Sequence, residues 1–207
     1  MWPAGRQGTT QMLSLLALFW LMVFLFSLSG SLRGWNRELI ATSGIVLALF
    51  AINQFGFQIL NLVGWTTAGL GDELTAAKRS FFLFASIFII ITFFSYQGPT
   101  MSSALGARLR IEKSLGNKML GFVIGAINGY LVIGGIWAFL EYFTTGMAAW
   151  VQYSPGVPYP FPQEIITRPG IDSAAANIIA NLPIPLLSPY LPYIMIVIFL
   201  FVIIAMI

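Results

Sequence analysis

Residues 30–39 read GSLRGWNREL and separate two long apolar segments, in a chain of which only 8% of the residues are charged. Arg33 and Arg37 can place their charged ends among lipid headgroups while their aliphatic stems stay in apolar surroundings. Trp35 suits the same interface, because its ring is apolar and its N–H needs a polar partner. Glu38 begins the next apolar segment, where the positive end of a helix dipole favours an acid. The stretch therefore predicts a short cytoplasmic turn between two membrane helices.

The composition of the chain is that of a membrane protein. Of its 207 residues, 58% are hydrophobic, and the mean hydropathy is +0.86. Soluble domains average about 25% charged and about 45–50% apolar residues, so a soluble fold of this chain would expose large apolar patches. The chain has no cysteine and no histidine, which excludes disulfides and thiolate metal sites and removes the usual metal ligand and general base. We therefore expect no bound metal and no cofactor, and no direct haem or pigment ligation.

Five segments are long and apolar enough to be predicted as membrane-crossing helices, since a span needs about 20 residues. They are residues 11–29, 38–63, 80–96, 119–143 and 190–207. The expected fold class is an all-α, polytopic helical bundle. It divides into a four-span core (1–145), a proline-rich extracytoplasmic loop with a short amphipathic helix (146–189) and a C-terminal transmembrane helix (190–207). Asp172 or Ser173 is the expected N-cap of the short helix.

Two of these segments leave an alternative open. The first resembles a signal peptide, although its apolar run exceeds the roughly 7–15 residues of a signal core. The second becomes polar toward its end, through Asn53, Gln54, Gln58 and Asn61. It either crosses as one straight helix, bends, leaves the membrane early, or turns those side chains toward a neighbouring helix, because polar groups in a bilayer face protein or water.

The distribution of basic residues predicts an orientation, because arginine and lysine in short loops favour the cytoplasmic side. The loops after the first and third segments hold six basic residues, Arg33, Arg37, Arg108, Arg110, Lys113 and Lys118. The other side holds four, Arg6, Lys78, Arg79 and Arg168. This difference predicts an N-terminus outside the cytoplasm, a cytoplasmic C-terminus and an extracytoplasmic proline-rich loop.

The fourth segment carries the most regular pattern in the chain. Gly121, Gly125 and Gly129 recur every four residues, and Asn128 lies beside them. Glycines at this spacing let helix backbones approach closely, and a carboxamide can bond across such an interface with a gain of about 0.5–2 kcal/mol. The pattern predicts a helix-packing face, occupied either by other spans of the same chain or by a second copy or partner subunit.

Few acidic residues are candidates for chemistry. Glu141 lies near the end of the fourth segment, and we expect an interfacial carboxylate there, since a proton relay would need an intramembrane partner. Asp72 and Glu73 are adjacent, but the sequence around them is typical of a solvated turn followed by a helix start. No phosphate-binding glycine motif occurs. We therefore expect no catalytic residues and no enzyme activity.

Two stretches together resemble the colicin V production protein family of bacterial inner-membrane proteins. The first, SLSGSLRGWNRELIATSGIVLALF (27–50), has an arginine–glycine pair followed by an arginine–glutamate pair and a small residue. The second, SLGNKMLGFVIGAINGYLVIGGIWAFLEYF (114–143), has a polar and a basic residue before the glycine-spaced helix. The matching positions are Arg33, Gly34, Arg37, Glu38, Gly44, Asn117, Lys118 and the glycines of the fourth segment. The resemblance covers approximately residues 10–145.

This resemblance implies a small, helical, non-enzymatic protein of the bacterial inner membrane, linked to toxin production or export and to envelope maintenance. Members typically have four spans and a polar tail, so the fifth segment is an addition. The resemblance transfers no catalytic residue and implies structural roles for the matching positions. A buried pair between Glu38 and Arg33 or Arg37 fits such a role, whereas Glu141 is expected at the opposite side of the membrane.

The leading functional hypothesis is a non-catalytic scaffold or accessory subunit that acts by helix–helix association. Its expected partners are membrane lipid and either other membrane subunits or a second copy, with no nucleic acid and no identifiable small-molecule substrate. One alternative is a transport component or channel, for which the only candidate polar path is Asn53, Gln54, Gln58, Asn61 and Asn128. Another is an accessory subunit of a larger respiratory or photosynthetic complex.

Overall fold

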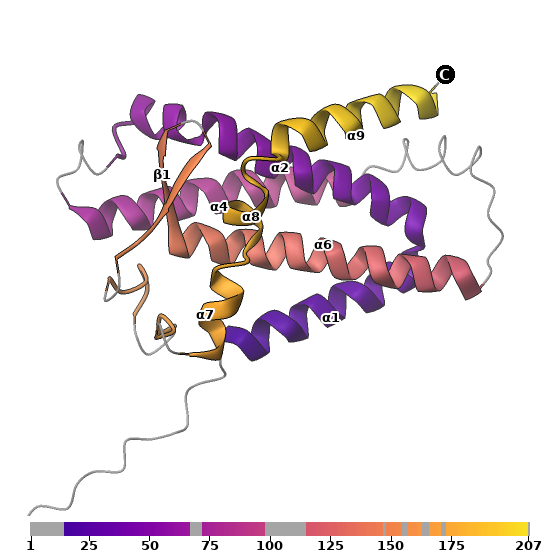
Figure 1. The fold of residues 1–207 in the computed structure, drawn as a ribbon, viewed down its shortest axis with the longest axis horizontal. Coiled ribbons are helices and arrows are strands. Elements are labelled where there is room, and N and C mark those ends of the chain that lie inside the picture. The colour runs from indigo at the N-terminus through magenta and orange to yellow at the C-terminus, as the bar shows by residue number, and fades with distance from the viewer. Residues whose placement is uncertain are drawn as a thin grey trace, which may run out of the picture.

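Four long helices form the body of the protein. The computed structural model describes residues 15–66, 72–97, 115–146, 148–154, 157–162, 166–170 and 173–206. The helices are α1 (Leu15–Arg33), α2 (Trp35–Leu62), α4 (Glu73–Gln97) and α6 (Leu115–Glu141), and they run alongside one another as a bundle (Figure 1). Each is long and apolar enough to cross a membrane. The predicted fold class, an all-α polytopic bundle, is confirmed.

The turn between α1 and α2 is a single residue. Gly34 has φ 85° and ψ 154°, a backbone conformation that glycine adopts at little steric cost. The side chain of Asn117, at the start of α6, accepts a hydrogen bond from the Trp35 backbone N–H at 3.4 Å. Beyond the turn, α2 continues as one helix to Leu62, so the polar residues of its second half do not interrupt it.

The closest helix contact in the described structure is between α1 and α6. The glycine face of α6 lies against the backbone of α1: a Cβ added at Gly125 would stand 2.6 Å from the Phe26 carbonyl oxygen, and one at Gly129 would stand 3.0 Å from the Val23 Cα. Gly30 of α1 meets Gly121 in the same way. The apolar core continues between α2, α4 and α6 through fully buried side chains, among them Leu49, Phe84, Phe88 and Phe139.

The chain leaves α6 as a β-hairpin, which the sequence analysis did not predict. Strand β1 (Tyr142–Gly146) pairs antiparallel with β2 (Ala149–Gln152), and Tyr142 lies opposite Gln152. The helix therefore ends at Glu141 and not at Phe143. The strands are rich in aromatic and β-branched residues, which favour extended backbone.

The described part of the chain after the hairpin contains three further helices, two of them within the proline-rich segment. The short helix predicted there is α7 (Ala174–Ile179), with Ser173 at its N-cap position, although the serine hydroxyl bonds the Gly170 carbonyl instead of capping. Helix α8 (Pro183–Leu187) was not predicted, and α9 (Leu191–Met206) is the expected C-terminal helix. The pair α7–α8 is bent by 60° against α9, so the described chain has four spans, or up to five if this bent segment counts as one.

Candidate functional site

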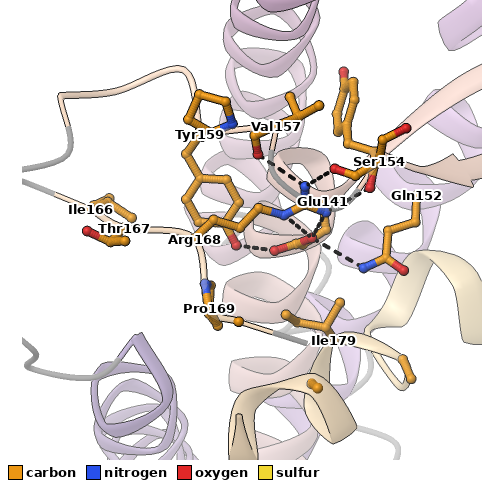
Figure 2. Close-up of a pocket in the computed structure, with 15 residues that line it drawn as sticks. Glu141, Gln152, Ser154, Val157, Tyr159, Ile166, Thr167, Arg168, Pro169 and Ile179 are labelled. Carbon is orange, nitrogen blue, oxygen red and sulfur yellow. Dashed lines mark hydrogen bonds and ion pairs between the residues drawn. The ribbon is translucent and has the colours of Figure 1, made fainter. Parts of the chain in front are cut away.

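Glu141, the last residue of α6, is fully buried at 0% exposure, where the sequence had suggested an interfacial carboxylate. Arg168 binds its Oε2 atom with two nitrogens, Nε at 3.1 Å and Nη2 at 2.8 Å. The Tyr159 hydroxyl donates to Oε1, and the Gln152 carboxamide donates to Oε2 at 3.4 Å. Figure 2 shows these side chains converging on the carboxylate from the hairpin and from the loop that follows it.

Arg168 also holds the loop around it. Its Nη1 donates to the backbone carbonyls of Ser154 at 2.8 Å and Val157 at 3.1 Å, and its Nη2 donates to the Tyr153 carbonyl at 2.9 Å. A guanidinium has five N–H donors. Together with the two bonds to Glu141, each of them has an acceptor in the structure. Arg168 therefore ties the loop that follows the hairpin to the end of α6 and has no donor left for an anionic ligand.

Tyr159 connects this pair to the membrane-embedded part of the bundle. Its hydroxyl accepts a hydrogen bond from the Trp137 indole N–H at 2.9 Å and donates to Glu141. Burial, and next the negative charge of Glu141, raise the pKa of Tyr159 well above its ordinary value of 10.0. The hydroxyl therefore remains protonated and acts as a permanent donor to the carboxylate.

A cavity of ≈ 650 Å³ lies beside the Glu141–Arg168 pair. Its wall is formed by the loop residues around Tyr159 and Arg168, by apolar side chains such as Ile166 and Pro169, and by one face of α7 that includes Ile179 (Figure 2). The one buried charge pair in this wall is already saturated with hydrogen bonds. No group of three or more potential metal ligands occurs in the part of the chain that the structure describes.

A second buried carboxylate lies near the other end of the bundle. Glu38 of α2 is 1% exposed, and Arg33 Nη1 bonds its Oε1 at 3.0 Å. The Tyr96 hydroxyl donates to Oε2 at 3.3 Å, and the Asn128 carboxamide donates to Oε2 at 2.8 Å. Glu38 thus receives the same three kinds of donor as Glu141: a guanidinium, a phenol and a carboxamide.

This second cluster joins all four long helices. Arg33 belongs to α1, and its guanidinium carbon lies 4.4 Å from the centre of the Tyr96 ring of α4. Asn128 of α6 also donates to the Glu38 backbone carbonyl at 3.0 Å, and Thr42 of α2 donates to the Asn128 carboxamide oxygen at 2.7 Å. Buried polar groups that are fully hydrogen-bonded in this way fix the relative positions of the elements that carry them.

The structure places the remaining predicted residues as follows. Arg37 is exposed and forms no ion pair with a described residue, so of the two candidate partners of Glu38 it is Arg33 that pairs. Lys118 is also exposed. Asp72 and Glu73 are exposed, and Asp72 caps α4 by accepting hydrogen bonds from Leu74 and Thr75. Arg6, Arg108, Arg110, Lys113 and the alternative N-cap Asp172 lie outside the described residues.

The residues proposed for a polar path are distributed between different environments. Gln58 and Asn61 are exposed, and Gln54 is half-buried. Asn53 and Asn128 are buried, but they bond in separate networks, Asn53 with Ser188 and Trp150 and Asn128 with Glu38 and Thr42.

Sequence reasoning missed the role of Arg168 and Tyr159. From the sequence, Arg168 was counted only as one of the four basic residues on the predicted extracytoplasmic side of the membrane. Its partner Glu141 lies 27 residues away, across a hairpin that the sequence did not reveal. The sequence did offer one signal: Glu38 and Glu141 each lie at the end of a long apolar segment. An acid that becomes buried there requires a positively charged partner.

The fold and these two sites define the class of the protein: a polytopic α-helical membrane protein whose buried charges are paired within the chain. The family model described as colicin V production protein matches residues 16–161. The chain belongs to this family, as the sequence resemblance indicated. The match includes the Glu38 cluster, the hairpin and Tyr159, and it ends before Arg168 and α7–α9. No curated protein and no solved structure matches the chain.

Proposed function

We propose that this protein is a non-catalytic scaffold or accessory subunit of the bacterial inner membrane, which holds other membrane components by helix–helix contact. Membership of the family links it to colicin V production. The observation that carries the proposal is that both buried carboxylates, Glu38 and Glu141, are neutralised by arginine and hydrogen-bonded by groups of the same chain.

A carboxylate that moves protons or binds a substrate must exchange its partners during the reaction. Glu141 instead faces a guanidinium with all donors used, a neutral phenol and a carboxamide. Glu38 of α2 accepts hydrogen bonds from side chains of the other three long helices. Both arrangements favour a fixed structural role, in which the two clusters keep the ends of the bundle rigid.

The exposed surface of the bundle supports a role in association within lipid. Large apolar side chains point outward along α1, α4 and α9, for example Trp20, Phe94 and Phe199, each more than half exposed. The excess of basic residues in the α1–α2 turn and in the segment before α6 supports an orientation with these loops in the cytoplasm. In this orientation the hairpin and the loop between it and α7 are extracytoplasmic, and lipid headgroups are partners of Arg37 and Lys118.

The test is to purify the full chain from native membranes in mild detergent, measure its native mass, and reconstitute it into liposomes. We expect a complex with other membrane proteins in a fixed ratio and no ion flux above protein-free liposomes. A closed homo-oligomer that conducts ions, with a flux lost in Gln58→Leu or Asn61→Leu, would overturn the proposal in favour of a channel. The variant Thr66→Ser, which preserves a hydroxyl beyond the end of α2, is the matched control for the reconstitution.

A further inference from the structure

The segment from α7 to α9 enters the bundle from the hairpin end. The Tyr142 hydroxyl of β1 donates to the Ile179 carbonyl at the end of α7, at 3.0 Å. The ring of Pro183 occupies the space that a side chain at Gly134 of α6 would take, because a Cβ there would stand 2.7 Å from the proline Cδ. Leu182 and Ile184 are 0% exposed. Helices α7 and α8 are therefore part of the packed core, although each is too short to cross a membrane.

Helix α9 has a different character. It is a 16-residue helix with no charged side chain, and its mid-section is mostly exposed, for example Val197 at 65% and Phe199 at 63%. At about 1.5 Å per residue it spans about 24 Å, less than the hydrocarbon core of about 30 Å. Helices α7 and α8 add further length to this segment on the hairpin side.

Pro189 lies in the break between α8 and α9, and Pro183, Pro185 and Pro192 lie in the two helices beside it; none of them can donate a backbone hydrogen bond. Inside a membrane, such a break persists only where protein groups satisfy the freed backbone atoms. Asn53 provides such a hydrogen bond at the break, because its Nδ2 donates to the Ser188 carbonyl at 3.2 Å. Asn53 is 1% exposed and lies in the second half of α2.

The same asparagine fixes the tip of the hairpin. The Trp150 indole N–H donates to its Oδ1 at 2.7 Å, and the Ala148 backbone N–H donates to its carbonyl at 3.0 Å. The Ser188 hydroxyl donates to the Ala148 carbonyl at 3.1 Å. Ala148 has φ 57°, a conformation that non-glycine residues hold only under constraint from their surroundings. One side chain thus joins α2, the hairpin and the α8–α9 junction.

We propose that residues 174–206 cross the membrane as a single discontinuous span, and that Asn53 is the latch that holds its break. In Figure 1, α9 leaves this junction toward the end of the bundle that carries the α1–α2 turn, away from the hairpin. The segment therefore crosses and does not return to the side from which it entered. Residues 188–190 join helix α9 to α8, and in this proposal the hydrogen bonds of Asn53 fix the position of α9 relative to the bundle.

The crossing is tested by labelling single cysteines, for which the cysteine-free natural chain is the blank. We choose Ala149→Cys in the hairpin, Lys118→Cys at the start of α6, both exposed in the structure, and Ile207→Cys at the chain end. A membrane-impermeant maleimide is applied to right-side-out and to inside-out vesicles. We expect Ile207→Cys and Lys118→Cys to react from one side and Ala149→Cys from the other. Labelling of Ile207→Cys from the hairpin side would show a re-entrant segment and overturn the proposal.

The latch is tested separately with a spin label at Val197→Cys on α9, in liposomes. Asn53→Leu removes the side-chain bonds to Ser188 and Trp150, and Asn61→Leu, at an exposed site of the same helix, is the matched control. We expect greater mobility of the label in Asn53→Leu, with an unchanged spectrum in Asn61→Leu and for a label at Ile127→Cys on α6. If the α9 label is equally immobile in both leucine variants, Asn53 is not the latch. Neither test depends on whether the protein is a scaffold.

Discussion

Asn128 on α6 donates both hydrogen bonds of its carboxamide to one residue of α2, reaching the Glu38 carboxylate at 2.8 Å and the Glu38 backbone carbonyl at 3.0 Å. It is 0% exposed, in the middle of a segment long enough to span the membrane. Because lipid offers no competing donors or acceptors, such a bond fixes the register of two helices as well as their distance. The glycine next to it in sequence, Gly129, brings α1 against the same helix.

Replacing Asn128 by leucine should destabilise the protein by about 0.5–2 kcal/mol, the range for interhelical hydrogen bonds in membranes. The change removes two donors from Glu38 and one of the two acceptors of the Thr42 hydroxyl, while Arg33 still neutralises the carboxylate. The free energy of unfolding in mixed detergent micelles measures the effect. The control is Ile127→Leu, a conservative change at a half-exposed neighbour. Equal stability of the two variants would contradict the structural role of Asn128.

Because Glu141 and Arg168 form a buried ion pair, we expect the effect on stability of replacing Arg168 to depend strongly on whether Glu141 is also replaced. Arg168→Ala leaves a buried carboxylate without its counter-ion, and we expect a loss of about 3–5 kcal/mol. In Arg168→Ala/Glu141→Gln the charge is removed as well, so the second change should recover part of the loss. The exposed Arg37→Ala serves as control and should stay within about 0.5 kcal/mol of the natural chain.

The measurement is a double-mutant cycle on thermal unfolding in detergent, together with protease cleavage of the loop between the hairpin and Arg168. Arg168 binds the carbonyls of Tyr153, Ser154 and Val157, so its loss should also speed cleavage there. Purely additive effects of the two substitutions would show that the residues do not interact.

The sequence was sufficient for the helical bundle because long apolar segments in a bilayer have few alternatives to a helix. It also located the Arg33–Glu38 turn and the glycine helix, since both are local patterns. It did not reveal the hairpin or Arg168, because these depend on contacts between distant residues. Asn53 was identified as a polar residue in an apolar helix and as a candidate for the polar path of a channel, and not as a link between elements. Its partners Ser188 and Trp150 are 135 and 97 residues away, and no spacing rule connects them.

The start of α4 should be sensitive to acid through Asp72. Its carboxylate accepts hydrogen bonds from the Thr75 side chain, the Thr75 backbone N–H and the Leu74 backbone N–H, which lower its pKa below the ordinary value of 3.8. A lowered folded-state pKa stabilises the folded form above the unfolded-state pKa, and this contribution is lost as the pH falls through 3.8 to the folded-state value. Protection of the first turn of α4 from hydrogen exchange should therefore be greater in the natural chain than in Asp72→Ala at pH 6.

This difference in protection should shrink as the pH falls below 3.8, where the carboxylate becomes protonated. Asp72→Asn keeps a neutral acceptor, so its protection should change less between these pH values than that of the natural chain. A difference between the natural chain and Asp72→Ala that is independent of pH would show that the carboxylate charge does not contribute to the cap.

The glycine face of α6 gives the clearest test of how the bundle is held together. A methyl group at Gly125 would stand 2.6 Å from the Phe26 carbonyl oxygen of α1, and neither backbone can yield without separating the two helices. Gly125→Ala should therefore cost about 1–3 kcal/mol, the usual range for overpacking. Gly170→Ala is the control, because a Cβ there meets nothing within 4 Å. Unfolding in detergent at several protein concentrations shows whether this face packs within one chain or between two copies of the chain. A loss of stability that is independent of concentration places the contact within one chain, whereas a change in oligomeric state with unchanged stability would place it between copies.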